Sequence, residues 1–242
     1  MSLHLGTSGW AYPEWKPGFY PADLRRDDFL DFYSRSLTGC EINATFYRLQ
    51  SEATIARWAD AVPDGFRFAV KAHRGLTHGR ELAPDPGPDG LLARFIASIE
   101  PLATRLGVVL LQFPPSRVRD DDALGRLLDG LPAGMPFAME FRHASWDAPK
   151  VAAHIAERRG TICWAETRGE VPEQLPPGPV AYVRLRAPHY DDAAREGWVE
   201  LLQREATERP VYVFSKHEGV PAGDPHAGVG LAQWLNARLA DT

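Results

Sequence analysis

Acidic and basic residues stand at the ends of short apolar segments, where a protein can use them for acid–base chemistry. Glu41 lies in GCEIN, Lys71 ends FRFAVK, and Glu140 lies in FAMEF. Carboxylates serve as general acids or bases, and a histidine such as His73 titrates near neutral pH. We therefore predict a catalytic group that comprises Glu41, Lys71, Glu140 and His73.

A second set of polar, basic and aromatic residues follows the same segments and is suited to holding a polar or anionic substrate. The loop GTSGWAYPEWKPGFYP, residues 6–21, offers the Ser8 hydroxyl and the flat face of Trp10. Arginine forms bidentate contacts with carboxylates and phosphates. The predicted substrate-binding residues are Ser8, Trp10, Asn43, Tyr47, Gln112, Arg142, Arg184, Lys216 and His217.

The segments that position these residues recur along the chain and are rich in Val, Ile, Leu and Phe. Such short apolar runs near Gly or Pro indicate buried strands. Helical periodicity fills most of the gaps, as at 51–62 behind a Ser51 cap and at 90–106, where Pro101 should end the regular helix. We expect eight strands, at residues 3–6, 39–43, 66–71, 107–113, 137–141, 161–166, 180–185 and 211–216.

Alternating strands and helices predict a parallel sheet with right-handed crossovers. Eight such units in 242 residues favour the α/β class and a single (β/α)8 TIM-barrel-like domain over residues 1–242, with a closed parallel sheet. The unit after residue 166 should be irregular, because residues 169–179 hold four prolines. An open doubly wound sheet is the alternative, but the first turn has no glycine-rich phosphate motif.

Side chains alternate between the two faces of a strand, so the sequence predicts which of them meet at the carboxyl ends. The inward pairs should include Glu41 with Asn43 and Trp164 with Glu166, whereas the two cysteines should face the helices. Carboxylates and cations would then meet in the interior of the barrel. A buried charge is tolerated there only when it is paired with an opposite charge or serves a function. Two interpretations stay open: a structural ion-pair network, and a pocket for an anionic ligand.

The composition excludes several classes of protein. The net charge of -5 provides no general attraction for nucleic acid or an anionic membrane. A nucleic-acid partner is therefore disfavoured but stays open, and we expect no membrane partner. Cys40 and Cys163 form no CxxC pair, which argues against zinc-knuckle and thioredoxin-like proteins. No apolar stretch approaches the roughly 18 residues of a membrane span, and no secretory signal begins the chain. We expect a cytoplasmic protein.

A metal site is a weaker alternative. Glu41, Glu140 and His217 offer carboxylate and imidazole ligands that suit a divalent metal. However, the sequence contains no HxH or HExxH spacing. We therefore assign no metal ligands and no cofactor, and keep a divalent metal as the alternative.

Seven motifs along the chain resemble the YecE-like family, also called domain of unknown function 72. They are GTSGWAYPEWKPGFYP, EINATFYRLQS, FRFAVKAHRGLTH, LLQFPPS, MEFRHASW, YVRL and VYVFSKHEG, between residue 6 and about 219. The resemblance implies a TIM-barrel-like fold and no established activity. Many members have His-Gly where this chain has Arg186-Ala187, and Asn-Asn after the phenylalanine that is Phe214 here.

These patterns favour an enzyme of the hydrolase, lyase or isomerase type that acts by carboxylate acid–base chemistry on a small polar or anionic metabolite, a class that includes phosphorylated compounds. The first alternative is a nucleic-acid-binding or phosphodiester-processing protein, whose aromatic loop (residues 6–21) stacks on unpaired bases. The second is a non-catalytic ligand-binding barrel. In the enzyme, the aromatic loop would cover the strand ends or form one wall of the pocket.

Overall fold

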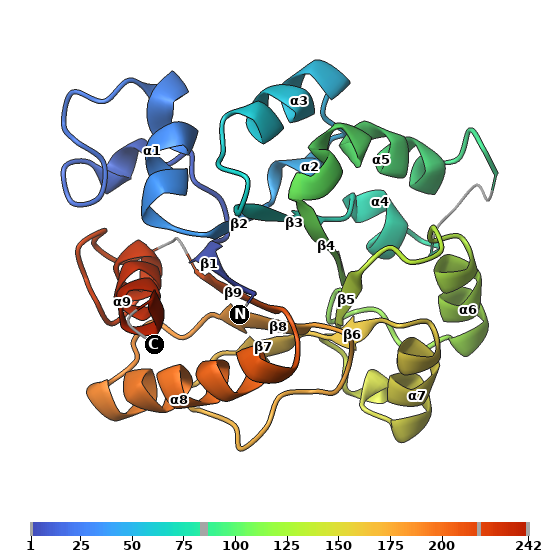
Figure 1. Cartoon of the computed structure of the whole chain (residues 1–242). Coiled ribbons are helices and arrows are strands. Elements are labelled where there is room, and N and C mark those ends of the chain that lie inside the picture. Colours follow the sequence, from blue (N-terminus) through green and yellow to red (C-terminus); the bar gives the residue numbers. More distant parts are fainter. Residues whose placement is uncertain (1, 83–86, 217–218, 241–242) are drawn as a thin grey trace.

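The chain folds into parallel β-sheets surrounded by helices (Figure 1). The computed structural model describes residues 2–82, 87–216 and 219–240. One sheet has the strand order β1-β9-β8-β7, the other has the order β2-β3-β4-β5-β6, and all neighbours are parallel. The strands are β1 (Leu3–Thr7), β2 (Gly39–Ile42), β3 (Arg67–Lys71), β4 (Leu106–Gln112), β5 (Phe137–Glu140), β6 (Thr161–Ile162), β7 (Trp164–Glu166), β8 (Ala181–Leu185) and β9 (Val211–Ser215).

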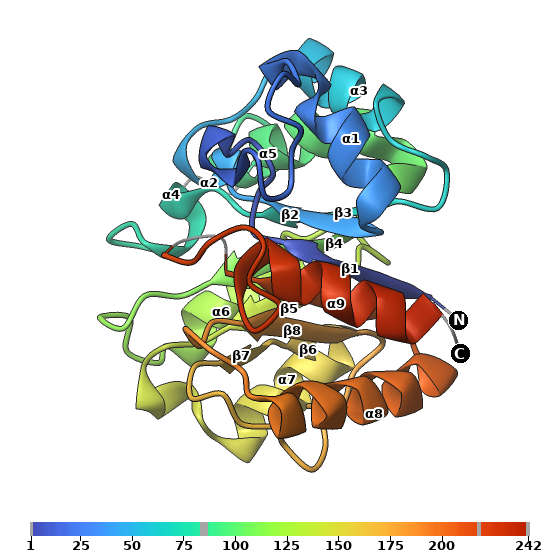
Figure 2. The same ribbon diagram turned by 90° about the vertical axis from the view of Figure 1, so that its left-hand side faces the viewer.

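Helices lie outside the strands on all sides of the view in Figure 1. The α-helices are α1 (Phe29–Ser36), α2 (Ala44–Tyr47), α3 (Glu52–Asp60), α4 (Arg74–Thr77), α5 (Leu91–Ile99), α6 (Asp121–Asp129), α7 (Pro149–Glu157), α8 (Asp192–Glu208) and α9 (Gly228–Ala240). Short 3-10 helices are η1 (Pro13–Trp15), η2 (Arg26–Asp28), η3 (Glu100–Arg105) and η4 (Ala144–Trp146). Figure 2 shows α9 beside β1, so the last helix packs against the first strand.

Local sequence signals fix several of these boundaries. The Ser51 hydroxyl accepts a hydrogen bond from Thr54 N at 3.2 Å and caps α3, as predicted. The regular helix α5 ends at Ile99, and Pro101 lies in the 3-10 helix that follows. Residues 167–180 contain no helix, which confirms the irregular unit expected after residue 166.

The two sheets meet at β1 and β2 without a main-chain ladder between these strands. Thr38 makes one main-chain bond to β1, from its N to Leu5 O at 3.1 Å, and its hydroxyl accepts a bond from Leu5 N at 2.9 Å. The Tyr33 hydroxyl accepts a bond from Thr7 N at 2.8 Å and donates one to Gly39 O at 3.0 Å. Side chains therefore supply most of the bonds between these two strands.

The sheets also meet where β6 and β7 follow each other, separated by Cys163 alone. The first of these strands pairs with β5 and the second with β8. The predicted closed sheet of eight strands is therefore confirmed only in its parallel α/β character. Cys163 divides the sixth predicted strand, which makes nine strands in the described residues, and ladders do not join the two sheets into one.

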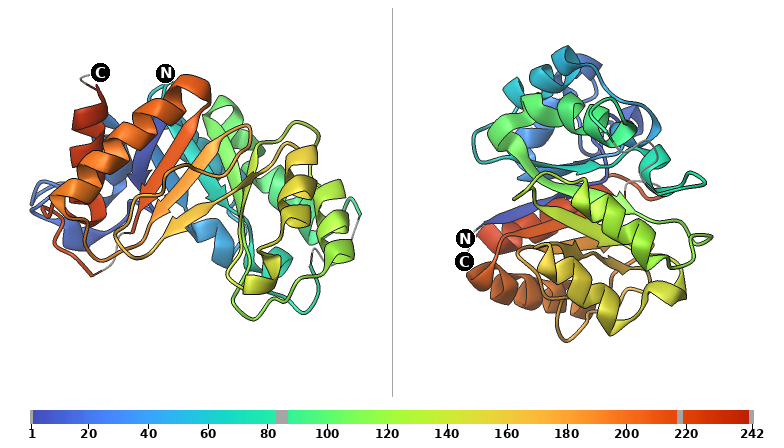
Figure 3. Two further views of the ribbon diagram at one scale, coloured as in Figure 1. Left: turned by 90° about the horizontal axis from the view of Figure 1, so that it is seen from below. Right: turned by 90° about the vertical axis from the view of Figure 1, so that its right-hand side faces the viewer.

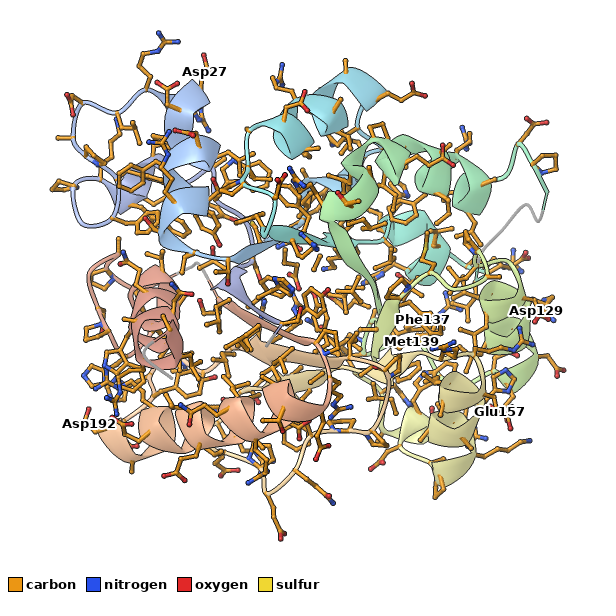
Figure 4. All side chains as sticks on the ribbon, viewed as in Figure 1. Asp27, Asp129, Phe137, Met139, Glu157 and Asp192 are labelled. Carbon is orange, nitrogen blue, oxygen red and sulfur yellow. The ribbon has the colours of Figure 1, made fainter. Side chains whose placement is uncertain are left out.

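The two faces of the strands carry different cores. The outward faces pack against the helices, as Phe137 and Met139 do on β5 (Figure 4). The inward faces form a separate small cluster, made of Ala69, Val108, Leu110, Ala138, Cys163, Val180, Tyr182, Tyr212 and Phe214. Cys40 lies in the outward core as predicted, but the prediction for Cys163 was wrong, because this residue belongs to the inward cluster.

The aromatic loop does not lie open over the strand ends. Trp15, Phe19 and Tyr20 are buried in the outward core. Tyr20 stacks on Phe29 of α1 with 4.1 Å between ring centroids. In Figure 3 this segment lies on the helix side of the strands. The expectation of an aromatic cover was therefore wrong for these three rings, because α1 offers them an apolar face to pack against.

Within the described residues, no helix is long and apolar enough to cross a membrane.

Candidate functional site

Arg184 lies at the centre of a group of buried charged residues at the carboxyl ends of the strands. Its side chain on β8 donates from Nη2 to Glu41 Oε1 at 2.8 Å, and from Nη1 to Glu140 Oε2. The Tyr182 hydroxyl donates to the other oxygen of Glu41 at 2.7 Å. All four residues are buried. Three separate strands, β2, β5 and β8, thus contribute to one hydrogen-bonded network.

Arg142 connects this network to solvent. Its Nε donates to Glu140 Oε1 at 2.6 Å, while 39% of its side chain is exposed. On another side, Arg186 Nη1 lies 3.4 Å from the Ser8 hydroxyl. Together with Lys71, these residues form what we call the charged cluster: Glu41, Lys71, Glu140, Arg142, Arg184 and Arg186. Four cations face two carboxylates, so the cluster has two excess positive charges when Lys71 is protonated.

Both carboxylates of the charged cluster are ionised at neutral pH. Burial by itself would raise the pKa of Glu41, but Arg184 and the Tyr182 hydroxyl outweigh burial and lower it to about 2. Burial likewise opposes ionisation of Glu140, yet the guanidinium groups of Arg184 and Arg142 hold its pKa below the usual range. Neither carboxyl group is therefore a proton donor near neutral pH.

Lys71 differs from the other cations of the cluster. It is 9% exposed, and its Nζ lies 3.9 Å from the ring centroid of Phe46. Burial, followed by the positive charge of Arg184, lowers the pKa of Lys71 from 10.5 to about 8, although Glu41 and Glu140 oppose this shift. Lys71 therefore exchanges its proton closer to neutral pH than an ordinary lysine does.

Uncharged polar groups complete the surroundings. Gln112 is 4% exposed, and its Nε2 lies 3.5 Å from Nε2 of His78. Burial, followed by the charge of Lys71, lowers the pKa of His78, so its imidazole is neutral at pH 7. Two residues after Glu41, the buried Oδ1 of Asn43 has no hydrogen-bond partner among the described residues. A buried acceptor without a partner is costly, and a ligand donor would relieve that cost.

A groove of about 560 Å³ begins beside Arg142 and runs along the carboxyl end of β5. A volume of several hundred Å³ is typical of small-molecule sites. Cys163 forms part of the groove wall. The other lining residues are Phe141, His143, Ala144, Trp146, Asp147, Ala148, Pro149, Ala152 and Ile162.

Three predicted site residues lie elsewhere. The ring of Trp10 packs edge-on against Trp58 of α3, 5.1 Å between centroids, and so belongs to the helix layer. His73 Nδ1 accepts a bond from Gly75 N at 3.1 Å and caps α4, and the structure shows no contact between it and the carboxylates. Tyr47 is 69% exposed. Lys216 follows β9 directly, and His217 falls outside the described residues.

The expected inward position of Glu166 was also wrong. Its carboxylate accepts bonds from Gly169 N at 2.8 Å and from the Tyr190 hydroxyl at 2.5 Å, which fixes the irregular loop after β7. Trp164 packs against the outward core of that sheet. The alternation itself continues through Cys163, because Ile162 pairs with Met139 of the outward core and Trp164 pairs with Val183 of the outward core of the other sheet. The prediction therefore placed this whole segment on the wrong face.

Sequence reasoning missed some residues of this site. Tyr182 precedes Arg184 by two positions and Arg186 follows it by two, so strand alternation could have found both. Phe46 and His78 lie outside the strands, where no periodic pattern applies; their rings contact each other edge-on at 4.9 Å between centroids.

The described residues contain no group of three or more His, Cys, Asp or Glu side chains that could hold a metal ion. The oxygens of Glu41 and Glu140 are instead directed at guanidinium and hydroxyl groups. An arginine between two carboxylates occupies the place that a cation would need. This donor set therefore does not fit the metal alternative formed by Glu41 and Glu140.

The family profile described as "Protein of unknown function DUF72" matches residues 4–241. The chain belongs to the DUF72 family. Two curated relatives of this DUF72 protein are the UPF0759 proteins YunF of Bacillus subtilis (strain 168) and YecE of Escherichia coli (strain K12). Each is 30% identical, over 61% and 60% of this chain respectively. The chain spans about half the length of these relatives, 53% of YunF and 50% of YecE.

Solved structures of other DUF72 proteins have the same fold. A DUF72 family protein from Thermotoga maritima MSB8 superposes with a TM-score of 0.78 at 22% identity, covering 99% of this chain and 100% of the other. One from Enterococcus faecalis V583 gives a TM-score of 0.71 at 17% identity, covering 99% and 96%. At these identities the likeness concerns the fold of this DUF72 protein alone.

Proposed function

We propose that this DUF72 protein is an enzyme that binds a small anionic metabolite, such as a phosphate ester or a carboxylate, at the charged cluster. The observation that carries the proposal is the excess of cations over carboxylates around a buried network that opens to solvent at Arg142. The proposal treats residues 1–242 as one domain in which the two sheets act as an eight-stranded barrel, with β6 and β7 as one strand.

The excess charge supports an anionic ligand for a physical reason. Glu41 and Glu140 already neutralise Arg184, so the positive charges of Arg142, Arg186 and Lys71 are not fully balanced within the cluster. Burial and the charge of Arg184 lower the pKa of Arg186, so its neighbours disfavour its charge. A bound anion would relieve this repulsion, and guanidinium groups suit the oxygens of phosphates and carboxylates.

The catalytic roles differ from the carboxylate acid–base pair expected from the sequence. Glu41 and Glu140 would hold Arg184 in place and stabilise positive charge that develops in the substrate. Lys71 would exchange the proton, because its pKa of about 8 lies closer to neutral pH than the pKa of about 2 of Glu41. Asn43 and Gln112 would orient polar groups of the substrate.

Thermal unfolding with a panel of phosphate esters and carboxylic acids tests this proposal. We expect at least one anion to raise the melting temperature of the wild type, because ligands that bind the folded state stabilise it. Arg142→Gln should weaken that binding by about tenfold or more. Arg158→Gln is the matched control, since Arg158 pairs with Asp129 on the surface. If no anion binds, or if both variants lose binding equally, the proposal is wrong.

The nucleic-acid alternative loses support from the structure. Trp15, Phe19 and Tyr20 are buried, so their faces are not free to stack on bases. The labelled acidic residues in Figure 4, Asp27, Asp129, Glu157 and Asp192, are exposed at the periphery. The net charge of -5 would repel a long polyanion, while a small anion can still reach the interior.

A further inference from the structure

We propose that Lys71 forms a Schiff base with the carbonyl carbon of its substrate, which is then an anionic aldehyde or ketone. This inference rests on the anion site of the proposed function and names the substrate class more closely. It starts from one arrangement: the primary amine of the buried Lys71 lies near two carboxylates that already form hydrogen bonds with Arg184.

The amine of Lys71 is left without a carboxylate partner. Arg184 takes one oxygen of Glu41 and one of Glu140, Tyr182 takes the second oxygen of Glu41, and Arg142 takes the second oxygen of Glu140. Among the described residues, Nζ of Lys71 has no hydrogen bond or ion pair, and its contact is the face of Phe46. Although the residue is 9% exposed, Nζ is not among the fully enclosed polar atoms that lack a partner, so a ligand can reach the amine.

The surroundings also favour the neutral, nucleophilic form of the amine. With a pKa of about 8, about a tenth of Lys71 is unprotonated at pH 7, compared with well under a thousandth of an ordinary lysine. A desolvated lysine next to other cations is an established means of activating an amine as a nucleophile. The arginines of the cluster cannot take this role, because they do not lose their protons in proteins.

The step balances without an oxidant or a reductant. Nζ adds to the carbonyl carbon and forms a C–N bond, while the electron pair of the C=O bond moves to oxygen and takes up a proton. The carbinolamine then expels that oxygen as water, and the nitrogen retains a double bond to carbon. One amine and one carbonyl thus give one imine and one water. Glu41 and Glu140 lie close enough to stabilise the charge of a protonated imine electrostatically.

His78 is placed to exchange protons in this step. Its ring and the amine of Lys71 both contact Phe46, at 4.9 Å between ring centroids and 3.9 Å from nitrogen to centroid. The charge of Lys71 contributes to the lowered pKa of His78, which leaves a neutral imidazole that can accept a proton. The charged groups that act on Lys71 from the surrounding elements are Arg184, Glu41, Glu140 and Arg142.

Reductive trapping tests the inference directly. The wild type is incubated with pyruvate, glyoxylate or glyceraldehyde 3-phosphate, treated with sodium cyanoborohydride, digested and mapped by mass spectrometry. We expect an adduct on Lys71 with at least one of these compounds, formed about tenfold or more faster than on Lys150, which is 78% exposed. Lys71→Arg should abolish the adduct at this position, and Lys150→Arg should leave the adduct on Lys71 unchanged.

Lactate and glycerol 3-phosphate separate this inference from the proposed function, because they carry the same anionic groups without a carbonyl. If they raise the melting temperature but no carbonyl compound labels Lys71 faster than Lys150, the Schiff base is wrong and the anion site stands. If neither binding nor labelling is seen, both proposals are wrong. The comparison of two lysines within the wild type does not depend on whether a variant folds.

Discussion

The guanidinium group of Arg184 lies 2.8 Å from the carboxylate of Glu41, although 143 positions separate these residues in the chain. Both side chains are almost completely buried, at 1% and 0% exposure. Their charges are tolerated because the two groups bond each other and because Tyr182 and Glu140 add further bonds, although Nε of Arg184 has no hydrogen-bond partner among the described residues. The pair links β8 to β2 across the space between the two sheets.

Removal of Arg184 should destabilise the protein strongly. Arg184→Met leaves Glu41 and Glu140 buried without their cation, so we expect the free energy of unfolding to fall by about 3–5 kcal/mol. Guanidinium chloride unfolding, followed by circular dichroism, measures this loss. Arg35→Met is the control, because Arg35 pairs with Asp31 on the surface and should cost about 0–1 kcal/mol.

The cause of that loss can be checked by adding Glu41→Gln and Glu140→Gln to Arg184→Met. If uncompensated charge is responsible, neutral amides should restore part of the lost stability. A triple variant that is no more stable than Arg184→Met would mean that packing, and not charge, explains the loss.

Stability should fall in acid through the ionisation of Glu41. Its pKa is lowered from 4.5 to about 2, so the unfolded chain binds more protons than the folded protein between these values. The contribution of Glu41 is therefore complete above pH 4.5 and is lost as the pH falls through about 2. Urea unfolding of wild type and Glu41→Gln at several pH values should show a stability gap at pH 7 that narrows below pH 4.5. A gap that stays constant in acid would contradict the assignment.

Replacement of Lys71 by an apolar residue should stabilise the protein at neutral pH. The pKa of Lys71 is lowered from 10.5 to about 8, so below pH 8 the folded protein carries a proton that its surroundings disfavour. Lys71→Met should raise the free energy of unfolding at pH 7 by up to about 3 kcal/mol. The wild type gains stability as the pH rises from 8 to 10.5, so this advantage should shrink there.

Lys150→Met provides the comparison for Lys71→Met, because Lys150 is 78% exposed. Its stability should match the wild type within about 0.5 kcal/mol at every pH. If both variants show the same pH dependence, the effect does not come from the buried position of Lys71. A stabilised but inactive Lys71→Met variant would be typical of a functional group kept at the expense of stability.

Gly6→Ala should disrupt the meeting of β1 with β2. A Cβ at Gly6 would lie 1.8 Å from Gly39 O and 2.5 Å from the Tyr33 hydroxyl, so the two strands would have to separate. We expect a loss of about 3 kcal/mol or more, or no soluble folded protein. Gly65→Ala is the control, since a Cβ there meets no atom within 4 Å. Equal melting temperatures for both variants would show that this strand contact tolerates adjustment.

The sequence by itself determined the elements and the type of fold. The apolar segments fall on the observed strands because buried parallel strands need continuous apolar residues. Ser51 caps α3 and Pro101 follows the end of α5, because cap hydrogen bonds and a missing N–H act locally. The charges at the ends of β2, β3, β5 and β8 could also be predicted, since alternation along one strand depends on that strand alone.

The tertiary structure alone decided how these charges are paired and which groups are left over. Nothing in the spacing of Glu41, Glu140 and Arg184 states that one guanidinium satisfies two carboxylates, because that depends on distances across the interior. The face that residues 161–166 present also depends on the pairing of Thr161 with Ala138 and of Trp164 with Val183, which no local pattern records. The unpaired amine of Lys71 follows from the first of these facts: a buried charge takes its properties from neighbours that are distant in sequence.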